Sequence, residues 1–342
     1  MVLFNRNVLV VCALMLSACN GNVSYRASHK EQIDIPLVIR NYDIGTGSCA
    51  FVSCPASGEA WLMDCGSSGS RNTKIESIKG DLSNSLEQGE LSIVISHADS
   101  DHLNLIPDVA SDGLVRAIFL GGKRSQYTDQ AFSSWLADQL DRGVPTVFVD
   151  NVEESSSGGE ILDLGCGSAS LSFLAADGSE SKNGNSLVTG ISFGQVDYLF
   201  TGDATGPVQQ ETIERLSQRD IDAQERQTVL IAPHHGSITH GSNSWAFAME
   251  VSPSMVVYSS NGRRYGHPRC EAVFNYALTS SLSTVEEHTL TCGESSGMRR
   301  KQTTASMYGT ADSETIEFSQ LSEGSPVVVT CYDSSLTKKN EC

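Results

Sequence analysis

Four apolar, strand-like segments of this 342-residue chain each run directly into polar side chains of the kinds that bind metal ions or substrates. The first segment, 91–96, is followed by His97, Asp99, Asp101 and His102. Buried carboxylates without partners are costly and clustered carboxylates repel one another, so this cluster requires a cation unless it is a solvated loop. The pattern therefore predicts a sheet with a metal site at the ends of its strands.

Two further segments show the same arrangement. The strand-like segment 196–200 leads to Asp203, whose two carboxylate oxygens can bridge two metal ions. The segment 228–232 leads to His234 and His235. Because successive residues of a strand point to opposite sides, we expect one of these histidines to be a ligand and the other to support the ligands from behind or to act as an acid or base.

A fourth segment, 255–259, is followed by a loop rich in hydrogen-bond donors. Arg263 and Arg264 in this loop, with Tyr265 beside them, are candidates for binding an anionic group of a substrate. A solvated basic loop is the alternative interpretation of the same residues.

Strand-like segments outnumber helical ones and alternate with them, which predicts an α/β (α+β) fold of packed sheets covered by helices. The expected strands are 36–43, 49–53, 60–63, 91–96, 115–120, 169–175, 187–193, 196–200, 228–232, 255–259, 316–318 and 326–331. The expected helices are 74–86, 129–141 and 271–278.

The charge balance limits the class of partner. Acidic residues number 41 against 23 basic ones, giving a formal net charge of -18. This excess argues against an extended basic face that binds nucleic acid. A small or oligomeric anionic substrate remains compatible, because a bound metal supplies positive charge locally. No feature of the sequence identifies a protein partner.

The N-terminus has the features of an export signal. Residues 1–18 contain Arg6 and a short apolar run, which is typical of a signal peptide. Cys19 follows a Leu-Ser-Ala sequence that resembles a bacterial lipobox, so we expect lipidation there and a membrane tether over 19–35. Asn20 favours the outer membrane, with the protein facing the periplasm. An ordinary signal or a short membrane anchor is the alternative.

Cysteine usage agrees with export. Eight of the ten cysteines lie beyond the signal and the lipidation position: Cys49, Cys54, Cys65, Cys166, Cys270, Cys292, Cys331 and Cys342. An even number in an oxidising compartment predicts disulfides, and none of them forms a CxxC metal pattern. Cys49 with Cys65 and Cys331 with Cys342 are plausible pairs, but the connectivity stays open.

Several of these segments resemble the metallo-β-lactamase superfamily. Segment 97–102 is similar to its HxHxDH motif with Asp99 in place of the middle histidine, a variant found in the hydrolase domain of ComEC competence DNA-uptake proteins. Other segments match in the same order: 42–48 (DVGQGD), 62–66 (IDTG), 183–188 (NxNSLV), 199–203 (LLTGD), 233–237 (PHHGS) and 265–268 (YGHP).

This resemblance implies a four-layer αββα sandwich with a short C-terminal extension. The hydrolase domain would occupy 36–280, and the Cys-containing extension 281–342 would complete or flank the sandwich.

The resemblance also implies a site for one or two divalent metal ions. Its metal ligands would be His97, Asp99, Asp101, His102, Asp203 and His235. Asp203 would bridge two positions, and Asp64 and Asn185 would support the ligands from behind. The superfamily has a further histidine ligand, which this chain lacks between His102 and His234. The resulting oxygen-rich set favours Mn²⁺ beside Zn²⁺.

The implied reaction is hydrolysis by water that the metal converts to hydroxide, with Asp101, His234 and His267 as catalytic residues. A phosphodiester is the preferred substrate class: a nucleotide, a short DNA or a phosphodiester of the cell envelope. The alternatives are a lactone or amide hydrolase of the superfamily, and an inactive lipoprotein that uses the fold for binding.

Overall fold

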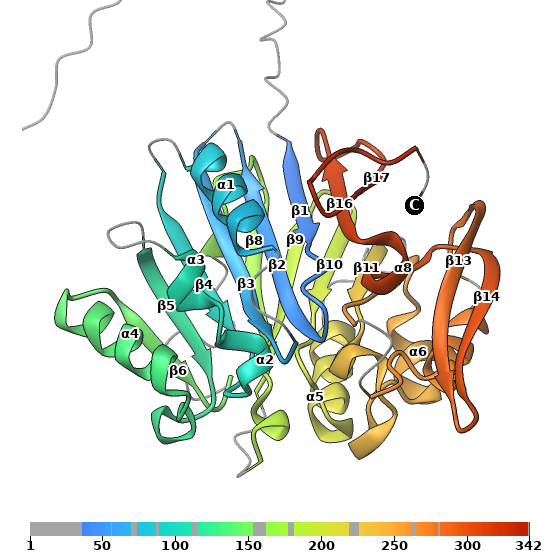
Figure 1. Ribbon diagram of the computed structural model, residues 1–342, viewed down its shortest axis with the longest axis horizontal. Helices are drawn as coiled ribbons and strands as arrows, with labels where there is room; N and C mark the ends of the chain where they lie inside the picture. The colour runs from blue at the N-terminus through green and yellow to red at the C-terminus, as the bar shows by residue number, and fades with distance from the viewer. Residues whose placement is uncertain are drawn as a thin grey trace, which may run out of the picture. The chain divides into compact units, whose positions relative to one another are not determined.

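Two large β-sheets form the centre of the computed structural model (Figure 1). The structure describes residues 36–55, 57–69, 74–86, 89–110, 115–152, 162–176, 181–218, 226–260, 265–279, 281–340 and 342. The expected signal peptide and tether, including Cys19, lie outside these residues, as do Arg263 and Arg264. No helix among the described residues combines the length and the apolar character needed to span a lipid bilayer.

The first sheet has eight strands. In spatial order they are β17 (Val328–Tyr332), β16 (Thr315–Gln320), β1 (Leu37–Asn41), β2 (Gly47–Cys54), β3 (Glu59–Ser67), β4 (Leu91–Ile95), β5 (Val115–Gly121) and β6 (Thr146–Val149). Strands β3 to β6 are parallel, so their carboxyl ends lie at one edge of the sheet.

The second sheet has seven strands. In spatial order they are β15 (Met307–Gly309), β12 (Met255–Tyr258), β11 (Gln227–Ile231), β10 (Val196–Phe200), β9 (Val188–Phe193), β8 (Ser170–Ala175) and β7 (Leu162–Asp163). Strands β10, β11, β12 and β15 are parallel, so this sheet also gathers carboxyl ends at one edge.

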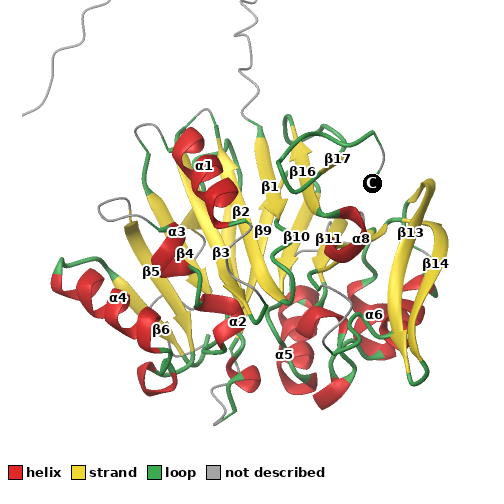
Figure 2. Cartoon of the chain, viewed as in Figure 1, coloured by secondary structure: helices red, strands yellow, loops and turns green. Residues whose placement is uncertain are grey.

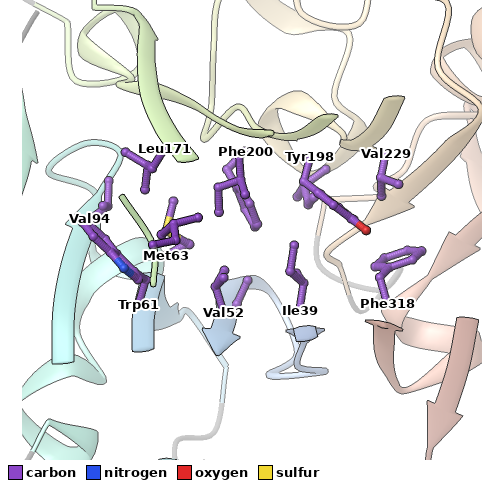
Figure 3. Close-up of a cluster of buried hydrophobic side chains, with 14 of the residues drawn as sticks. Ile39, Val52, Trp61, Met63, Val94, Leu171, Tyr198, Phe200, Val229 and Phe318 are labelled. Carbon is purple, nitrogen blue, oxygen red and sulfur yellow. The ribbon is translucent and has the colours of Figure 1, made fainter. Parts of the chain in front are cut away.

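The sheets pack face to face through an apolar core. Figure 3 shows Val52 and Ile39 of the first sheet opposite Phe200 and Tyr198 of the second. All four side chains are buried. Alternate residues of each strand point into this layer, as expected for sheets that are covered on both faces.

Helices cover the outer faces of both sheets. Ile78 and Leu82 of α1 (Ile75–Ser85) belong to the same buried cluster as Ile93 of β4. The helices α3 (Ile106–Val109) and α4 (Gln130–Asp141) complete that layer.

On the second sheet, α5 (Gly206–Ser217), α6 (Trp245–Val251) and α7 (Cys270–Ala277) share a buried cluster with β10, β11 and β12. The expected αββα sandwich is therefore confirmed.

The C-terminal segment contributes to both sheets and adds a separate hairpin. Strand β15 joins the second sheet, while β16 and β17 join the first. The strands β13 (Thr284–Glu294) and β14 (Gly297–Ala305) form a two-stranded sheet of their own, at the right of Figure 2, and the disulfide between Cys270 and Cys292 joins β13 to α7. The short helix α8 (Thr310–Ser313) links β15 to β16.

Four disulfides involve all eight cysteines of the described region. They join Cys49 to Cys65, Cys54 to Cys166, Cys270 to Cys292, and Cys331 to Cys342. The first and last are the pairs that the sequence made plausible, whereas the other two join segments whose proximity only the fold reveals.

Candidate metal centre

The segments that follow β4, β10 and β11 meet where the carboxyl ends of the two sheets adjoin. His97 follows β4, His102 lies in the short helix α2 (Ser100–Leu103), Asp203 follows β10 and His235 follows β11. All four side chains are buried. Suitable atoms of His97, His102 and Asp203 lie within 4.8 Å of one another.

Two imidazoles and one carboxylate oxygen face each other on one side of this cluster. The Nε2 atom of His102 lies 3.0 Å from Oδ1 of Asp203 and 3.3 Å from Nε2 of His235. The His235 Nε2 atom is 3.4 Å from the same oxygen. Asp101 adds a carboxylate oxygen 3.9 Å from His235 Nε2.

The other ring nitrogen of each histidine fixes the tautomer. His235 Nδ1 lies 2.8 Å from the Ser259 carbonyl oxygen, which only accepts, so this nitrogen donates. His102 Nδ1 likewise donates to Asp64, whose Oδ2 is 2.8 Å away. In the neutral form of each ring, Nε2 therefore carries a lone pair that points toward Asp203, where it can bind a proton or a metal ion. Such second contacts are typical of histidines that bind metals.

His97 occupies the opposite side of Asp203 with the same tautomer. The Ser96 hydroxyl donates to Asp64 Oδ2 at 2.8 Å, so it accepts from Nδ1 of His97 at 3.0 Å. The Nε2 atom of His97 lies 3.8 Å from Asp203 Oδ2 and 3.5 Å from Asp99 Oδ2.

Several of these buried atoms have no hydrogen-bond partner among the described residues. They include Nε2 of His97 and Oδ1 of Asp203. Lone pairs that converge without hydrogens between them repel each other unless a cation lies among them. Nitrogen and oxygen donors with this spacing fit one or two divalent ions such as Zn²⁺ or Mn²⁺.

The electrostatics without metal show how strongly the cluster attracts positive charge. Burial alone would lower the pKa of His102, but the carboxylates of Asp203 and Asp64 outweigh it and raise this pKa well above its usual value. Burial would raise the pKa of Asp203, but His102 and His235 hold it well below its usual range.

Asp64 accepts hydrogen bonds that hold Ser96 and His102 in position. It accepts the Ser96 backbone N–H at 2.6 Å, the Ser96 hydroxyl and the Nδ1–H of His102. Its backbone is left-handed, with φ of 51°. Gly66 allows α2 to approach closely, because a Cβ there would overlap the backbone of Asp101 and His102.

The two adjacent histidines differ from the expectation for a strand. The segment Pro233–Gly236 is a short 3₁₀ turn in which His234 and His235 have φ of 49° and 56°. Strand alternation does not apply there, and both imidazoles reach Asp203. His234 Nε2 lies 3.4 Å from Oδ2, whereas His235 contacts Oδ1.

His267 lies next to His234, and Tyr265 lies next to His267. The ring centres of His234 and His267 are 5.8 Å apart, and those of Tyr265 and His267 are 5.9 Å apart. Burial lowers the pKa of His267 to about 4, so its imidazole is neutral at pH 7.

The segment that contains Asn185 contributes other residues to the cluster. The Asn185 side-chain amide donates to the Ser181 carbonyl oxygen at 3.0 Å. Asn183 instead contacts the site, with Nδ2 at 3.3 Å from Asp203 Oδ2.

Lys182 lies beside Asp99. Its Nζ atom is 3.1 Å from Asp99 Oδ1. The imidazole of His97, whose Nε2 atom lies 3.5 Å from Asp99 Oδ2, is the largest cause that lowers the pKa of Asp99 to about 2, and Lys182 adds to the effect.

Sequence reasoning did not identify Ser96, Ser259, Lys182 or Asn183 as parts of this site. The NxNSLV resemblance covered Asn183, but the supporting role was assigned to Asn185, and Lys182 lies just before the matched segment. Nothing in the sequence singled out Ser96 or Ser259, because each acts only through a histidine that the fold brings to it.

Comparison with known proteins yields structural likeness only. No known protein family matches the sequence, and no curated protein matches it. A mutant of the CmlA β-hydroxylase is 14% identical with a TM-score of 0.41, over 71% of this chain and 49% of that one. The present chain thus spans about half the length of that protein.

Two other solved structures show similar likeness. Igni18, a metallo hydrolase from the archaeon Ignicoccus hospitalis, is 13% identical with a TM-score of 0.40, over 77% of this chain and 98% of that one. A metallo-β-lactamase from Staphylococcus aureus is 15% identical with a TM-score of 0.34, over 58% of this chain and 56% of that one. Scores this low carry no argument, so the fold and the metal centre rest on the geometry described above.

Proposed function

We propose that this protein is a metal-dependent hydrolase that acts on phosphodiester bonds. One observation carries the proposal: His97, His102 and His235 each donate through Nδ1, so that Nε2 of each ring faces the carboxylate of Asp203. A set of imidazoles prepared in this way is costly without a cation and of no evident use to a binding scaffold.

A bound divalent ion would supply one kind of chemistry, because it lowers the pKa of a bound water toward about 7 and polarises an oxygen of the substrate. The chain supplies the rest. Asp64 and Ser259 hold His102 and His235 in orientation. Asp101, whose side chain is 21% exposed, is placed to accept a proton at the open side of the site.

Charge near the substrate would come from residues at the rim. Lys182 carries a positive charge beside Asp99 and can stabilise an anionic oxygen. His267, with its lowered pKa, stays neutral near pH 7 and can offer a hydrogen bond from a ring N–H. We propose that Tyr265, Arg263 and Arg264 bind the substrate.

The phosphodiester class is supported by the motif order that resembles ComEC-type hydrolase domains and by the ligand set rich in carboxylates. The net charge of -18 favours a nucleotide, a short oligonucleotide or an envelope phosphodiester over long DNA. We further propose that the protein is exported, which the four disulfides support, and that it is lipidated at Cys19.

A substrate panel tests the activity. Metal-free and Zn²⁺- or Mn²⁺-loaded protein would be incubated with bis-p-nitrophenyl phosphate, short single-stranded DNA, a lactone and a β-lactam. We expect metal-dependent cleavage of the first two substrates, its loss in Asp203→Ala, and full activity in Asp138→Ala, whose side chain is exposed on α4. Turnover of only the lactone or β-lactam would assign a different substrate class, and no metal binding would favour a binding lipoprotein.

A further inference from the structure

Asp203 separates the two neighbouring histidines of the turn Pro233–Gly236. Its Oδ1 atom faces His235 and its Oδ2 atom faces His234, each at 3.4 Å. The left-handed backbone at both histidines turns their rings to opposite sides of one carboxylate. A carboxylate with imidazoles on both oxygens is suited to bridge two metal ions.

Asn183 indicates which atom of His234 is available. Its Nδ2 atom lies 3.3 Å from Asp203 Oδ2 and 3.5 Å from Nε2 of His234. An amide N–H₂ group only donates, so the Nε2 atom that faces it accepts and carries a lone pair. His234 therefore presents the same kind of atom to Asp203 as do His97, His102 and His235.

The distances on this side match a shared ion. Around Asp203 Oδ2, Nε2 of His234 lies at 3.4 Å and Nε2 of His97 at 3.8 Å. Oδ2 of Asp99 is 3.5 Å from Nε2 of His97. Two ligands on one tetrahedral ion lie about 3.3 Å apart when each bond is about 2.0 Å long. Each of these three distances is close to the separation expected for two ligands of one ion.

We propose that His234 is a metal ligand and completes a position formed with His97, Asp99 and Asp203. It takes the place of the histidine that this chain lacks between His102 and His234. The second position consists of Asp101, His102, His235 and the other oxygen of Asp203, so the site holds two bridged ions. The inference rests on the proposed function only in that the site binds metal.

Metal stoichiometry tests this assignment without an activity measurement. The full-length protein would be stripped of metal, loaded with Zn²⁺, freed of excess ion and analysed by mass spectrometry of the elements. We expect two ions per chain for the wild type and one for His234→Ala. His240→Ala is the matched control. The His240 ring is exposed and stacks on the His234 ring with 6.5 Å between ring centres, but it belongs to neither metal position, so this variant should keep two ions.

Cobalt substitution provides an independent readout. Two Co²⁺ ions bridged by Asp203 should be magnetically coupled in the wild type and in His240→Ala, whereas His234→Ala should give the spectrum of a single uncoupled ion. If His234→Ala fails to fold, anomalous diffraction from crystals of the Zn²⁺-loaded wild type decides the question, because His234 Nε2 must lie within bonding distance of one of two peaks.

The outcomes separate this inference from the proposed function. Two ions in His234→Ala, or one ion in the wild type, would overturn the role of His234 while leaving a metallohydrolase intact. No bound metal in the wild type would overturn both.

Discussion

Asp64 orients the histidines of the site although it is not itself one of the candidate metal ligands. Its two oxygens receive the Ser96 backbone, the Ser96 hydroxyl and the Nδ1–H of His102, so one carboxylate orients two metal-facing histidines, His97 through Ser96 and His102 directly. Support of this kind raises the basicity of an imidazole and fixes its direction.

The substitution Asp64→Asn tests this role. Asparagine tolerates the left-handed backbone at this position but offers one acceptor oxygen instead of two. We expect the affinity for Zn²⁺ to fall by about 10- to 100-fold, with little change in the far-ultraviolet circular dichroism spectrum. Competition with a chromophoric chelator measures the affinity, and an unchanged value would contradict the role of Asp64.

His102 gives the metal-free protein a characteristic pH dependence. Its pKa is raised in the folded state by Asp203 and Asp64, so the folded chain binds a proton more tightly than the unfolded chain. The resulting stabilisation is complete below the unfolded pKa of about 6.5 and is lost as the pH rises through the folded pKa. Metal must displace this proton, so Zn²⁺ affinity should increase over the same range.

Calorimetry from pH 6 to pH 9 measures how the stability of the metal-free and the Zn²⁺-loaded protein changes with pH. The Tm of the EDTA-treated wild type should decrease with rising pH relative to His102→Asn, and the Zn²⁺-loaded wild type should not show this decrease. Parallel curves for the metal-free wild type and the variant would show that His102 holds no extra proton.

At the scale of single residues, spacing in the sequence identified most of the cluster. His97, Asp101 and His102 follow an apolar strand so closely that packing does not explain them, and the structure brings them together with Asp203 and His235. The sequence did not predict the separate positions of His234 and His235 around Asp203, because these depend on a left-handed turn where strand geometry was expected.

Elements with a clear apolar pattern were predicted well. The expected helix 129–141 corresponds to α4 (Gln130–Asp141), and Asp129 caps it by accepting the Phe132 N–H at 3.1 Å. The hairpin β13–β14 was not expected, because most β14 side chains are exposed and polar and show no alternation. Helix α5 was also missed, since its outer face is polar and only a narrow stripe is buried.

The hairpin β13–β14 contacts the loop that carries His267. The backbone N–H of Gly293 donates to the Pro268 carbonyl oxygen at 2.8 Å, and the disulfide between Cys270 and Cys292 fastens the same contact. A Cβ at position 293 would overlap the backbone of Gly266. The end of the hairpin therefore supports the position of His267.

The substitution Gly293→Ala should displace this loop and lower kcat by about tenfold, with the metal content unchanged, because misplacing a catalytic group by about 1 Å can cost up to about 100-fold. Gly324→Ala is the matched control, since no atom lies within 4 Å of a Cβ added there. Steady-state kinetics combined with metal analysis distinguishes this from loss of metal. An unchanged kcat in Gly293→Ala would show that the hairpin does not position His267.

For the whole molecule, the pattern of strands and ligand clusters predicted the layers but not how the layers join. The strand β3 and the segment after β4 supply Asp64, His97 and His102, whereas the segments after β10 and β11 supply Asp203 and His235. The site is complete only when the two sheets are packed together. The disulfide between Cys54 and Cys166 links the same two halves, and its separation of 112 residues places it beyond any local pattern.

Because the ligands come from both halves, a bound metal ion should stabilise the whole fold. An ion that binds only the folded state adds about 4.1 kcal/mol at a free concentration of 1,000 times its Kd. For a chain of this size that energy raises the Tm by about 6 °C. Thermal unfolding with and without Zn²⁺ measures the shift, which should be absent in Asp203→Ala and retained in Asp138→Ala. An equal shift in Asp203→Ala would mean that the stabilising ion binds elsewhere and that the two sheets do not share it.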